Sequence, residues 1–323
     1  QFVAGKNKII NGDFGIWQRG TSFTLTSGTD TLCADRFYFN AAGTGTAGTV
    51  TQQTFTAGTA PVTGYEGTYF ARITNFATTA TQWQWRQRME DVRLFANQTI
   101  TISFWAKAST NQSGTNVRIW QNFGSGGSAA VNTDISSTFT ITTSWTRYSF
   151  TITLPSISGK TIGTSSYLEL TTYNTTPATS STVDFWGVQV EAGSTATPFT
   201  TATGTLAGEL AACQRYYWRT TTTATNGAVT TLITGKSSTE ARGSVKMPVS
   251  MRVGATSVEY GNTLAFDSAS AFDANVNSVS ILSANPDYVV CSFGAASGLT
   301  QYRPYYVTGN SSATAYLGFN AEL

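Results

Sequence analysis

Apolar and polar residues alternate along much of the first two hundred positions of the chain. The pattern is clearest in residues 99–109, where one face consists of Ile100, Ile102, Phe104 and Ala106. Similar runs occupy residues 116–123, 145–155 and 166–174, and residues rich in Gly, Ser, Thr and Asn separate them. A period of two residues predicts half-buried β-strands. Because no helix long enough for a crossover lies between these runs, a sandwich or barrel is favoured over a parallel sheet.

One stretch, LAGELAACQRYYWRT at residues 206–220, has a helical period. Its apolar stripe consists of Leu206, Leu210, Cys213 and Tyr217. Thr205 can serve as N-cap and Glu209 lies in the first turn, while Arg215 and Arg219 lie towards the C-terminal end, all in accord with the helix dipole. A helix this short is not stable alone in water, so it must pack on something. We expect a connector whose packing residues are Leu206, Leu210, Cys213, Tyr216, Tyr217 and Trp218.

A second block of alternating residues follows the helix and includes SVKMPVSMRV and DYVVCSF. The chain has 323 residues, which is enough for two hydrophobic cores. We therefore expect an all-β protein with a β-sandwich at 1–203, a helical connector at 204–220 and a smaller C-terminal β-sandwich at 221–323.

Composition excludes several classes of function. Only 11% of the residues are charged and the net charge is +2 without a basic cluster, which argues against a nucleic-acid partner. No apolar run is long enough for membrane insertion. The absence of histidine excludes Ser-His-Asp and Cys-His catalysis and removes the commonest metal ligand. The cysteines, Cys33, Cys213 and Cys291, are widely spaced, and we expect buried free thiols.

The stretch TQWQWRQRMED at residues 81–91 has one polar face and one apolar face. Planar amides and guanidinium groups beside an aromatic ring suit sugar recognition, because they form paired hydrogen bonds with hydroxyls while the ring stacks on the apolar side of a pyranose. Two strands supply the candidates for a glycan-binding face: Gln84, Arg86, Arg88, Arg118, Trp120 and Asn122. The alternative is that Trp83, Trp85 and Met89 belong to the core and that the polar row is ordinary solvated sheet or a subunit contact.

Acidic residues give little sign of catalysis or of a metal site. A glycosidase needs two facing acids, and the neighbours Glu90 and Asp91 would lie on opposite faces of a strand. We therefore expect that the protein is not an enzyme. Asp13 in NGDFGIW is a candidate calcium ligand, although a lone Asp in such a sequence more often forms a turn.

Several motifs resemble those of phage tail-fibre and related virion-appendage proteins that carry a jelly-roll like that of carbohydrate-binding modules. These motifs are NKIINGDFGIWQRG, QWRQRMED, ITISFWAKAS, FWGVQVEAGSTATPF, ELAACQRYYWR and the terminal AYLGFNAEL. The resemblance implies a virion protein, usually a homotrimer, whose jelly-roll and tip domain face the host surface. Its partners would be other tail or capsid proteins and a host glycan or receptor.

At two positions this chain differs from the carbohydrate-binding modules whose jelly-roll it resembles. Those modules often carry a glutamate after NGDF that binds a structural calcium, and this chain has Gly15 there. They also often end a strand in paired acids where this chain has Gln189. Apart from that calcium, no cofactor is expected.

Three functions remain open. The first is a non-enzymatic fibre or appendage subunit that binds a host-surface glycan. The second is a purely structural capsid or tail decoration protein. The third is a glycan-degrading tail spike, against which the lack of a convincing acid pair counts.

Overall fold

The computed structural model describes residues 5–323 except 44–45, 63–64, 75–79, 262–263 and 269–271. The chain forms two compact units, one of residues 1–212 with Leu323 and one of residues 213–322. Strands make up most of the regular structure in both units, which confirms the all-β prediction. In the described part of the chain, no helix is long and apolar enough to cross a membrane.

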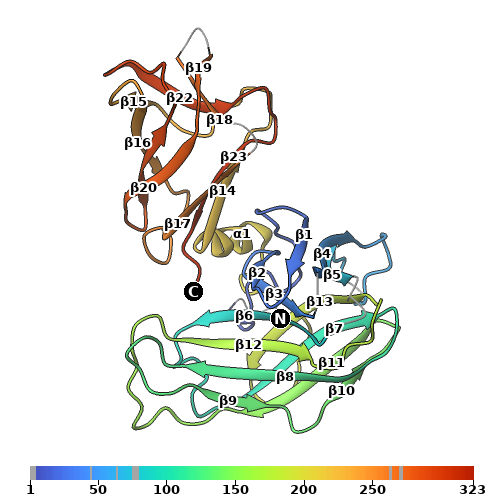
Figure 1. Cartoon of the computed structure of the whole chain (residues 1–323). Coiled ribbons are helices and arrows are strands. Elements are labelled where there is room, and N and C mark those ends of the chain that lie inside the picture. Colours follow the sequence, from blue (N-terminus) through green and yellow to red (C-terminus); the bar gives the residue numbers. More distant parts are fainter. Residues whose placement is uncertain (1–4, 44–45, 63–64, 75–79, 262–263, 269–271) are drawn as a thin grey trace. The chain divides into compact units, whose positions relative to one another are not determined.

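The first unit is a sandwich of two antiparallel sheets (Figure 1). One sheet has six strands in the order β1 (Ser22–Thr26), β4 (Thr46–Thr54), β5 (Tyr69–Thr74), β13 (Val183–Ala192), β7 (Thr99–Ala108) and β11 (Thr146–Thr153). The other has β10 (Phe139–Ile141), β8 (Gln112–Asn122), β12 (Tyr167–Asn174), β6 (Gln82–Glu90), β3 (Phe37–Ala42) and β2 (Thr31–Leu32), and β9 (Val131–Asp134) pairs with β8.

Strand β6 alternates between buried and half-buried residues along its whole length. Trp83 and Trp85 are fully buried between the two sheets, and the ring of Trp85 lies 5.8 Å from that of Phe104 on the opposite sheet. Met89 is buried with them, so these three residues are core, as the alternative interpretation of this stretch held. The polar row of β6 therefore lies on the outer face of its sheet.

Strand β7 differs from the half-buried strand that its sequence predicts, because both of its faces are buried. Ser103 and Trp105 lie on the face away from the sandwich core and are nevertheless 0% and 7% exposed. A second aromatic cluster covers that face; its buried members are Phe55, Phe70, Trp105, Trp186 and Phe199. Residues from outside the strand decide this burial, so the local pattern could not show it.

Helix α1 (Leu206–Gln214) is shorter than predicted. Thr205 Oγ1 accepts a hydrogen bond from the Gly208 amide at 3.1 Å, which confirms the N-cap, and Glu209 lies in the first turn. The prediction of helix for residues 217–220 is wrong, since these residues form strand β14 (Tyr217–Thr221). Strand pairing with β23 (Tyr316–Asn320) supplies the hydrogen bonds that a longer helix would have made.

The expected connector residues therefore divide into two groups. Leu206 and Leu210 are 72% and 38% exposed, so the predicted apolar stripe is not buried along its length. Cys213, Tyr216 and Tyr217 are buried. Trp218 stacks on Phe319 with a ring separation of 6.2 Å, within the second unit. Arg215 and Arg219 lie beyond the last helical residue, so neither is part of the last turn.

The second unit contains a three-stranded and a seven-stranded antiparallel sheet around its own core. The small sheet has the order β14, β23, β17 (Ser257–Gly261). The large sheet has the order β19 (Phe272–Asn275), β18 (Leu264–Asp267), β22 (Pro304–Gly309), β15 (Ile233–Gly235), β16 (Glu240–Lys246), β21 (Tyr288–Gly294) and β20 (Ser278–Ala284).

Close packing in the small sheet requires a glycine at position 318. The Tyr217 hydroxyl donates to Glu259 at 2.9 Å across Gly318, and a Cβ atom on residue 318 would lie only 2.6 Å from that hydroxyl.

The three cysteines are buried free thiols, as predicted. Burial raises the pKa of Cys291 to about 12, which makes this thiol unreactive at neutral pH.

Candidate functional site

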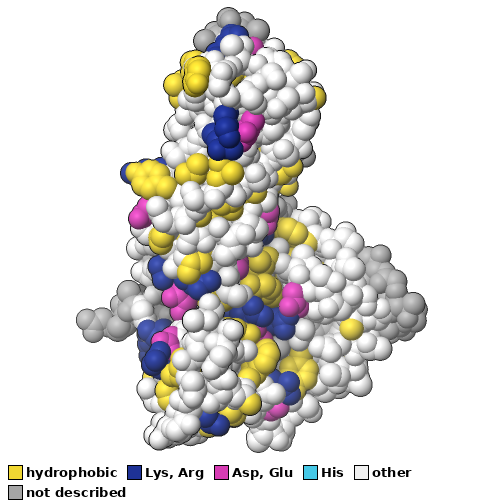
Figure 2. All heavy atoms as spheres, turned by 60° about the vertical axis from the view of Figure 1, so that its left-hand side comes forward, with side chains coloured by type: hydrophobic (Ala, Val, Ile, Leu, Met, Phe, Trp, Pro, Cys, Tyr) yellow, Lys and Arg dark blue, Asp and Glu magenta, His cyan; other side chains and the backbone are white. Residues whose placement is uncertain are grey.

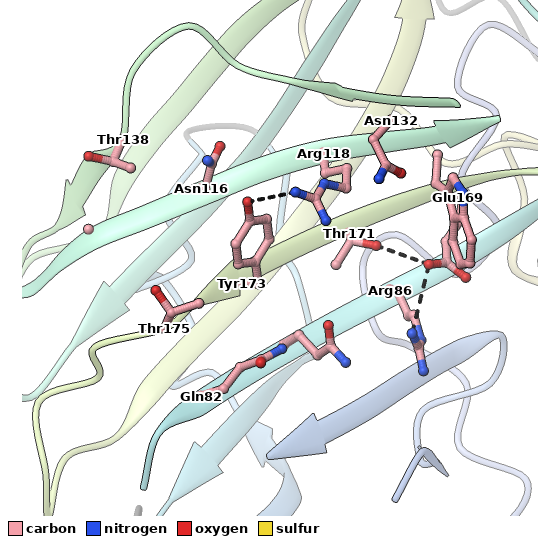
Figure 3. Close-up of a pocket in the computed structure, with 13 residues that line it drawn as sticks. Gln82, Arg86, Asn116, Arg118, Asn132, Thr138, Glu169, Thr171, Tyr173 and Thr175 are labelled. Atoms are coloured by element: carbon pink, nitrogen blue, oxygen red, sulfur yellow. Dashed lines mark hydrogen bonds and ion pairs between the residues drawn. The ribbon is translucent and has the colours of Figure 1, made fainter. Parts of the chain in front are cut away.

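A cavity of about 600 Å³ lies over the outer face of the sheet that contains β6, β8 and β12 (Figure 3). Its lining residues are Gln82, Gln84, Arg86, Gly114, Asn116, Arg118, Trp120, Asn132, Thr138, Glu169, Thr171, Tyr173 and Thr175. Every one is polar, aromatic or glycine, so the cavity presents hydrogen-bonding groups and rings. We call it the cleft.

Strand register explains how residues far apart in sequence come together in the cleft. Strand β12 lies between β6 and β8, and Thr171 pairs with Arg86 on one side and with Arg118 on the other. Because side chains two residues apart share a face, Glu169 and Tyr173 lie in the rows on either side of Thr171. Figure 3 shows these side chains projecting from three neighbouring strands into one space.

Four of the six residues proposed from the sequence line the cleft, namely Gln84, Arg86, Arg118 and Trp120. The other two lie on the same face just outside it. Arg88 donates from Nε to Glu169 at 2.9 Å, and Asn122 donates to the Tyr167 hydroxyl at 3.1 Å. The structure thus brings all six to one face of the sheet.

Sequence reasoning missed the contribution of β12, which supplies Glu169, Thr171 and Tyr173 to the middle of the cleft. The alternation in SYLELTTYN indicated a strand, and its polar positions were visible. Nothing in that run shows that its neighbours are β6 and β8, because pairing between distant strands depends on the whole fold.

A buried carboxylate lies at the centre of the site. Glu169 is 1% exposed, accepts a hydrogen bond from Thr171 Oγ1 at 3.1 Å and lies 3.9 Å from Arg86 Nη1. Burial lowers the pKa of Arg88, but the hydrogen bond and charge of Glu169 outweigh it and raise the pKa. Burial also lowers the pKa of Arg86, which forms a second ion pair with Asp30. These ion pairs hold both guanidinium groups in place.

A second ion pair fixes the other side of the cleft. Arg118 donates from Nε and Nη2 to Asp134 at 2.8 and 3.0 Å, a bidentate pair between β8 and β9. The hydrogen bond to Asp134 is the main cause of the raised pKa of Arg118. Tyr173 joins them: its hydroxyl donates to Asp134 at 3.2 Å, and the guanidinium lies 5.1 Å from its ring centre.

Charges in and around the cleft balance. Three arginines, Arg86, Arg88 and Arg118, are paired with three acids, Asp30, Asp134 and Glu169. The wider surface has the same character: in Figure 2, basic and acidic side chains lie in small mixed groups on a largely uncharged face. The cleft therefore attracts neither anions nor cations strongly.

Aromatic rings accompany the polar groups. Trp120 is half-buried and meets Tyr167 edge-on, with ring centres 6.2 Å apart. Tyr173, also half-buried, lies within the cleft. Among the described lining residues, Glu169 is the only carboxylate.

Asp13 lies in a separate cavity of about 350 Å³, together with Gly15, Tyr65 and Glu66. Its carboxylate accepts from the Gly15 amide and from the Tyr65 hydroxyl, each at 3.3 Å. Burial, and after it the charge of Glu209, raises the pKa of Asp13. Among the described residues, no group of three or more His, Cys, Asp or Glu side chains is placed to hold a metal ion.

Gln189, the other position that departs from the modules, has a structural role. Its amide donates to Glu191 at 2.8 Å and to Thr197 Oγ1 at 3.2 Å. Lys6 forms an ion pair with the same Glu191 at 3.1 Å. The Gln189 amide therefore hydrogen-bonds to the buried carboxylate of Glu191, whose charge is already balanced by Lys6.

Comparison with known families gives one sequence match. Residues 38–170 match the family model described as "Carbohydrate binding domain", and this range contains all six residues proposed from the sequence. The first unit contains a carbohydrate-binding domain. No curated protein matches the chain in sequence.

Solved structures similar to the chain are of low identity. One is the enzymatically active domain of tailspike protein 4 of bacteriophage CBA120, at 14% identity and TM-score 0.38, covering 58% of this chain and 22% of that chain. Another, described as "CBM4 structure and function", has 21% identity and TM-score 0.33 and covers 57% of this chain and 98% of that chain. A third is the CBM22-1 xylan-binding domain of Paenibacillus barcinonensis Xyn10C, at 11% identity and TM-score 0.34, covering 61% and 100%. At these values the structures support no conclusion about ligand or assembly.

Proposed function

We propose that the cleft binds an uncharged polysaccharide. The observation that carries this proposal is the pairing of arginines with acids, between β6 and β12 and between β8 and β9, inside the segment that matches a carbohydrate-binding domain. Guanidinium and amide groups held rigid in this way offer paired hydrogen bonds to hydroxyls at little entropic cost. Because Arg86, Arg88 and Arg118 are already neutralised, an anionic polymer gains little from them.

Rings complete the chemistry of the cleft. Trp120 and Tyr173 offer faces on which the apolar side of a sugar ring can stack. Gln84, Asn116 and Asn132 supply amides that can both donate and accept.

For the whole chain we propose a non-enzymatic virion fibre or appendage subunit, exposed on the phage particle and acting as a homotrimer. The motif resemblance supports this role, and the finding that Glu169 is the only acid among the described lining residues of the cleft supports the absence of hydrolysis. Weak binding at each cleft would be multiplied by assembly, since linking sites raises avidity by about 10² to 10⁴. Light scattering that shows a monomer at micromolar concentration would contradict the trimer.

A glycan array with the full chain tests the binding proposal. We expect wild type to bind at least one neutral polysaccharide and Trp120→Ala to weaken that binding about tenfold, because one stacked ring and its contacts are lost. The matched control is Trp145→Ala, a half-buried tryptophan that packs against the other sheet. Equal binding by wild type and Trp120→Ala would refute the role of the cleft.

The other two functions predict different outcomes. A purely structural decoration protein would bind neither host cells nor their purified polysaccharides. A glycan-degrading spike would release new reducing ends from the polysaccharide that it binds, and we expect none.

A further inference from the structure

One face of the large sheet in the second unit carries exposed apolar side chains. Phe272 on β19 and Tyr306 on β22 are 52% and 42% exposed, and Leu232, directly before β15, is 55% exposed. Strand β18 lies between β19 and β22, and β15 is the next strand beyond β22. We call Leu232, Asp267, Phe272 and Tyr306 the β22 patch. Exposed apolar groups on neighbouring strands mark a contact surface more often than isolated ones do.

An acid lies between the two rings of this patch. Asp267 on β18 pairs with Phe272 on one side and with Tyr306 on the other. Its neighbour Phe266 is fully buried, so Asp267 projects from the opposite, exposed face. Within the described structure, the half-buried carboxylate of Asp267 accepts no hydrogen bond and pairs with no cation.

The nearest ion pair does not use this carboxylate. Arg303 lies 3.7 Å from Asp273 and donates a hydrogen bond to Ser268. These partners hold the guanidinium of Arg303, so Asp267 keeps its full capacity to accept hydrogen bonds.

A strained turn adds a further tyrosine close to the start of β22. Tyr302 is 79% exposed and has a φ of 66°, a left-handed conformation that is rare for a large side chain. Its amide donates to the Gly235 carbonyl at 2.8 Å, and the Tyr305 hydroxyl accepts from the Thr300 amide at 2.7 Å. The first of these hydrogen bonds holds the backbone of Tyr302 while its side chain stays exposed, and strain of this kind is frequent at functional positions.

We propose that the β22 patch is a second sugar-binding site, separate from the cleft, which takes an uncharged sugar residue. A free carboxylate can accept hydrogen bonds from two neighbouring hydroxyls, and the rings of Tyr306 and Phe272 on either side can contact the apolar faces of the sugar. Among the described residues Asp267 forms no ion pair, and Arg303 on the neighbouring Ser268 is paired with Asp273, so an acidic sugar would be repelled.

A second copy of the chain in a twofold contact is a poorer occupant, and a threefold contact, which joins two different surfaces, is decided by light scattering in the test below. A twofold contact places the same patch of both copies face to face, which would bring two Asp267 carboxylates together without a cation. Burying unpaired like charges is strongly unfavourable. A neutral sugar removes this difficulty, because its hydroxyls supply the donors that Asp267 lacks.

The test uses the full chain with binding at the cleft weakened by Trp120→Ala. The probe is an array of immobilised neutral oligosaccharides built from glucose, galactose, mannose, xylose or N-acetylglucosamine, with polygalacturonate as the anionic comparison. We expect Trp120→Ala to retain binding to at least one neutral member and none to polygalacturonate. Adding Asp267→Asn should weaken the retained binding by at least about tenfold, because charge-assisted hydrogen bonds are lost.

A matched control is available in the same sheet. Tyr288 on β21 is 44% exposed, close to the value for Tyr306, and β21 lies three strands from β22. Tyr306→Ala should weaken the retained binding, whereas Tyr288→Ala should leave it unchanged. Circular dichroism melts of all variants show that the second unit stays folded.

Three outcomes overturn the proposal. The first is that Trp120→Ala binds no member of the array, and the second is that Asp267→Asn and Tyr306→Ala leave its binding unchanged. The third is that Tyr306→Ala changes the molecular mass by light scattering, which would make the patch a subunit contact. Failure of the cleft proposal looks different, because wild type and Trp120→Ala would then bind equally and both would depend on Asp267.

Discussion

Glu169→Gln is the substitution that tests the electrostatics of the cleft most directly. It keeps the size of the side chain and removes the negative charge that Arg88 and Arg86 share. Removing one partner of a fully buried ion pair costs about 3–5 kcal/mol, and exchanging a charged for a neutral hydrogen bond costs about 1 kcal/mol. Glu169 is nearly inaccessible but the two arginine side chains are 19% and 14% exposed, so water stabilises them in part. We expect a loss of about 2 kcal/mol in the free energy of unfolding, between these limits.

Urea unfolding followed by tryptophan fluorescence measures this loss. Seven of the eight tryptophans lie in the first unit and only Trp218 lies in the second, so the signal reports mainly on the unit that contains Glu169. The control is Glu66→Gln, an exposed glutamate of the same unit, which should change stability by less than about 0.5 kcal/mol.

A double-mutant cycle with Arg88→Gln decides whether the ion pair is the cause. If it is, the two substitutions together cost less than the sum of the single losses, because the second removes a charge that the first left unpaired. Additive losses, or a loss for Glu169→Gln no larger than that of the control, would refute the reasoning.

Three further outcomes are expected from the structure. Burial raises the pKa of Asp35 from 3.8 to about 6, so the folded state binds more protons than the unfolded state between these values. The unfolding free energy should therefore fall as pH rises from about 4 to 6. Asp35→Asn should make this slope smaller in urea titrations, and an unchanged slope would contradict the assignment to Asp35. Tyr302→Gly should raise the stability of the second unit by about 1 kcal/mol in thermal unfolding, since glycine accepts the left-handed conformation, and an unchanged or lower melting temperature would contradict the strain. Gly318→Ala should destabilise that unit by about 1–3 kcal/mol by crowding the Tyr217 hydroxyl, and Tyr217→Phe should restore part of the loss if the hydroxyl is the obstacle.

Sequence by itself determined which residues of β6 face outward. A strict period of two placed Arg86 and Arg88 on one side of the strand and Trp83 and Trp85 on the other, because successive side chains of a strand point to opposite faces. The same local rule placed Arg118 and Trp120 together, and the N-cap at Thr205 followed from the capacity of its hydroxyl to accept a backbone hydrogen bond.

Only the tertiary structure decided what lies beside each strand. Pairing of β12 with both β6 and β8 brought Glu169 between the arginines, and this pairing joins residues about 45 to 90 positions apart. The hydroxyl side chains on one face of β7 predicted that this face is exposed to solvent, but an aromatic cluster covers it. Pairing of β14 with β23 ended the helix before Tyr217. The physical reason is the same in each case: local sequence sets the period and the caps, whereas burial and hydrogen-bond partners depend on contacts between distant parts of the chain.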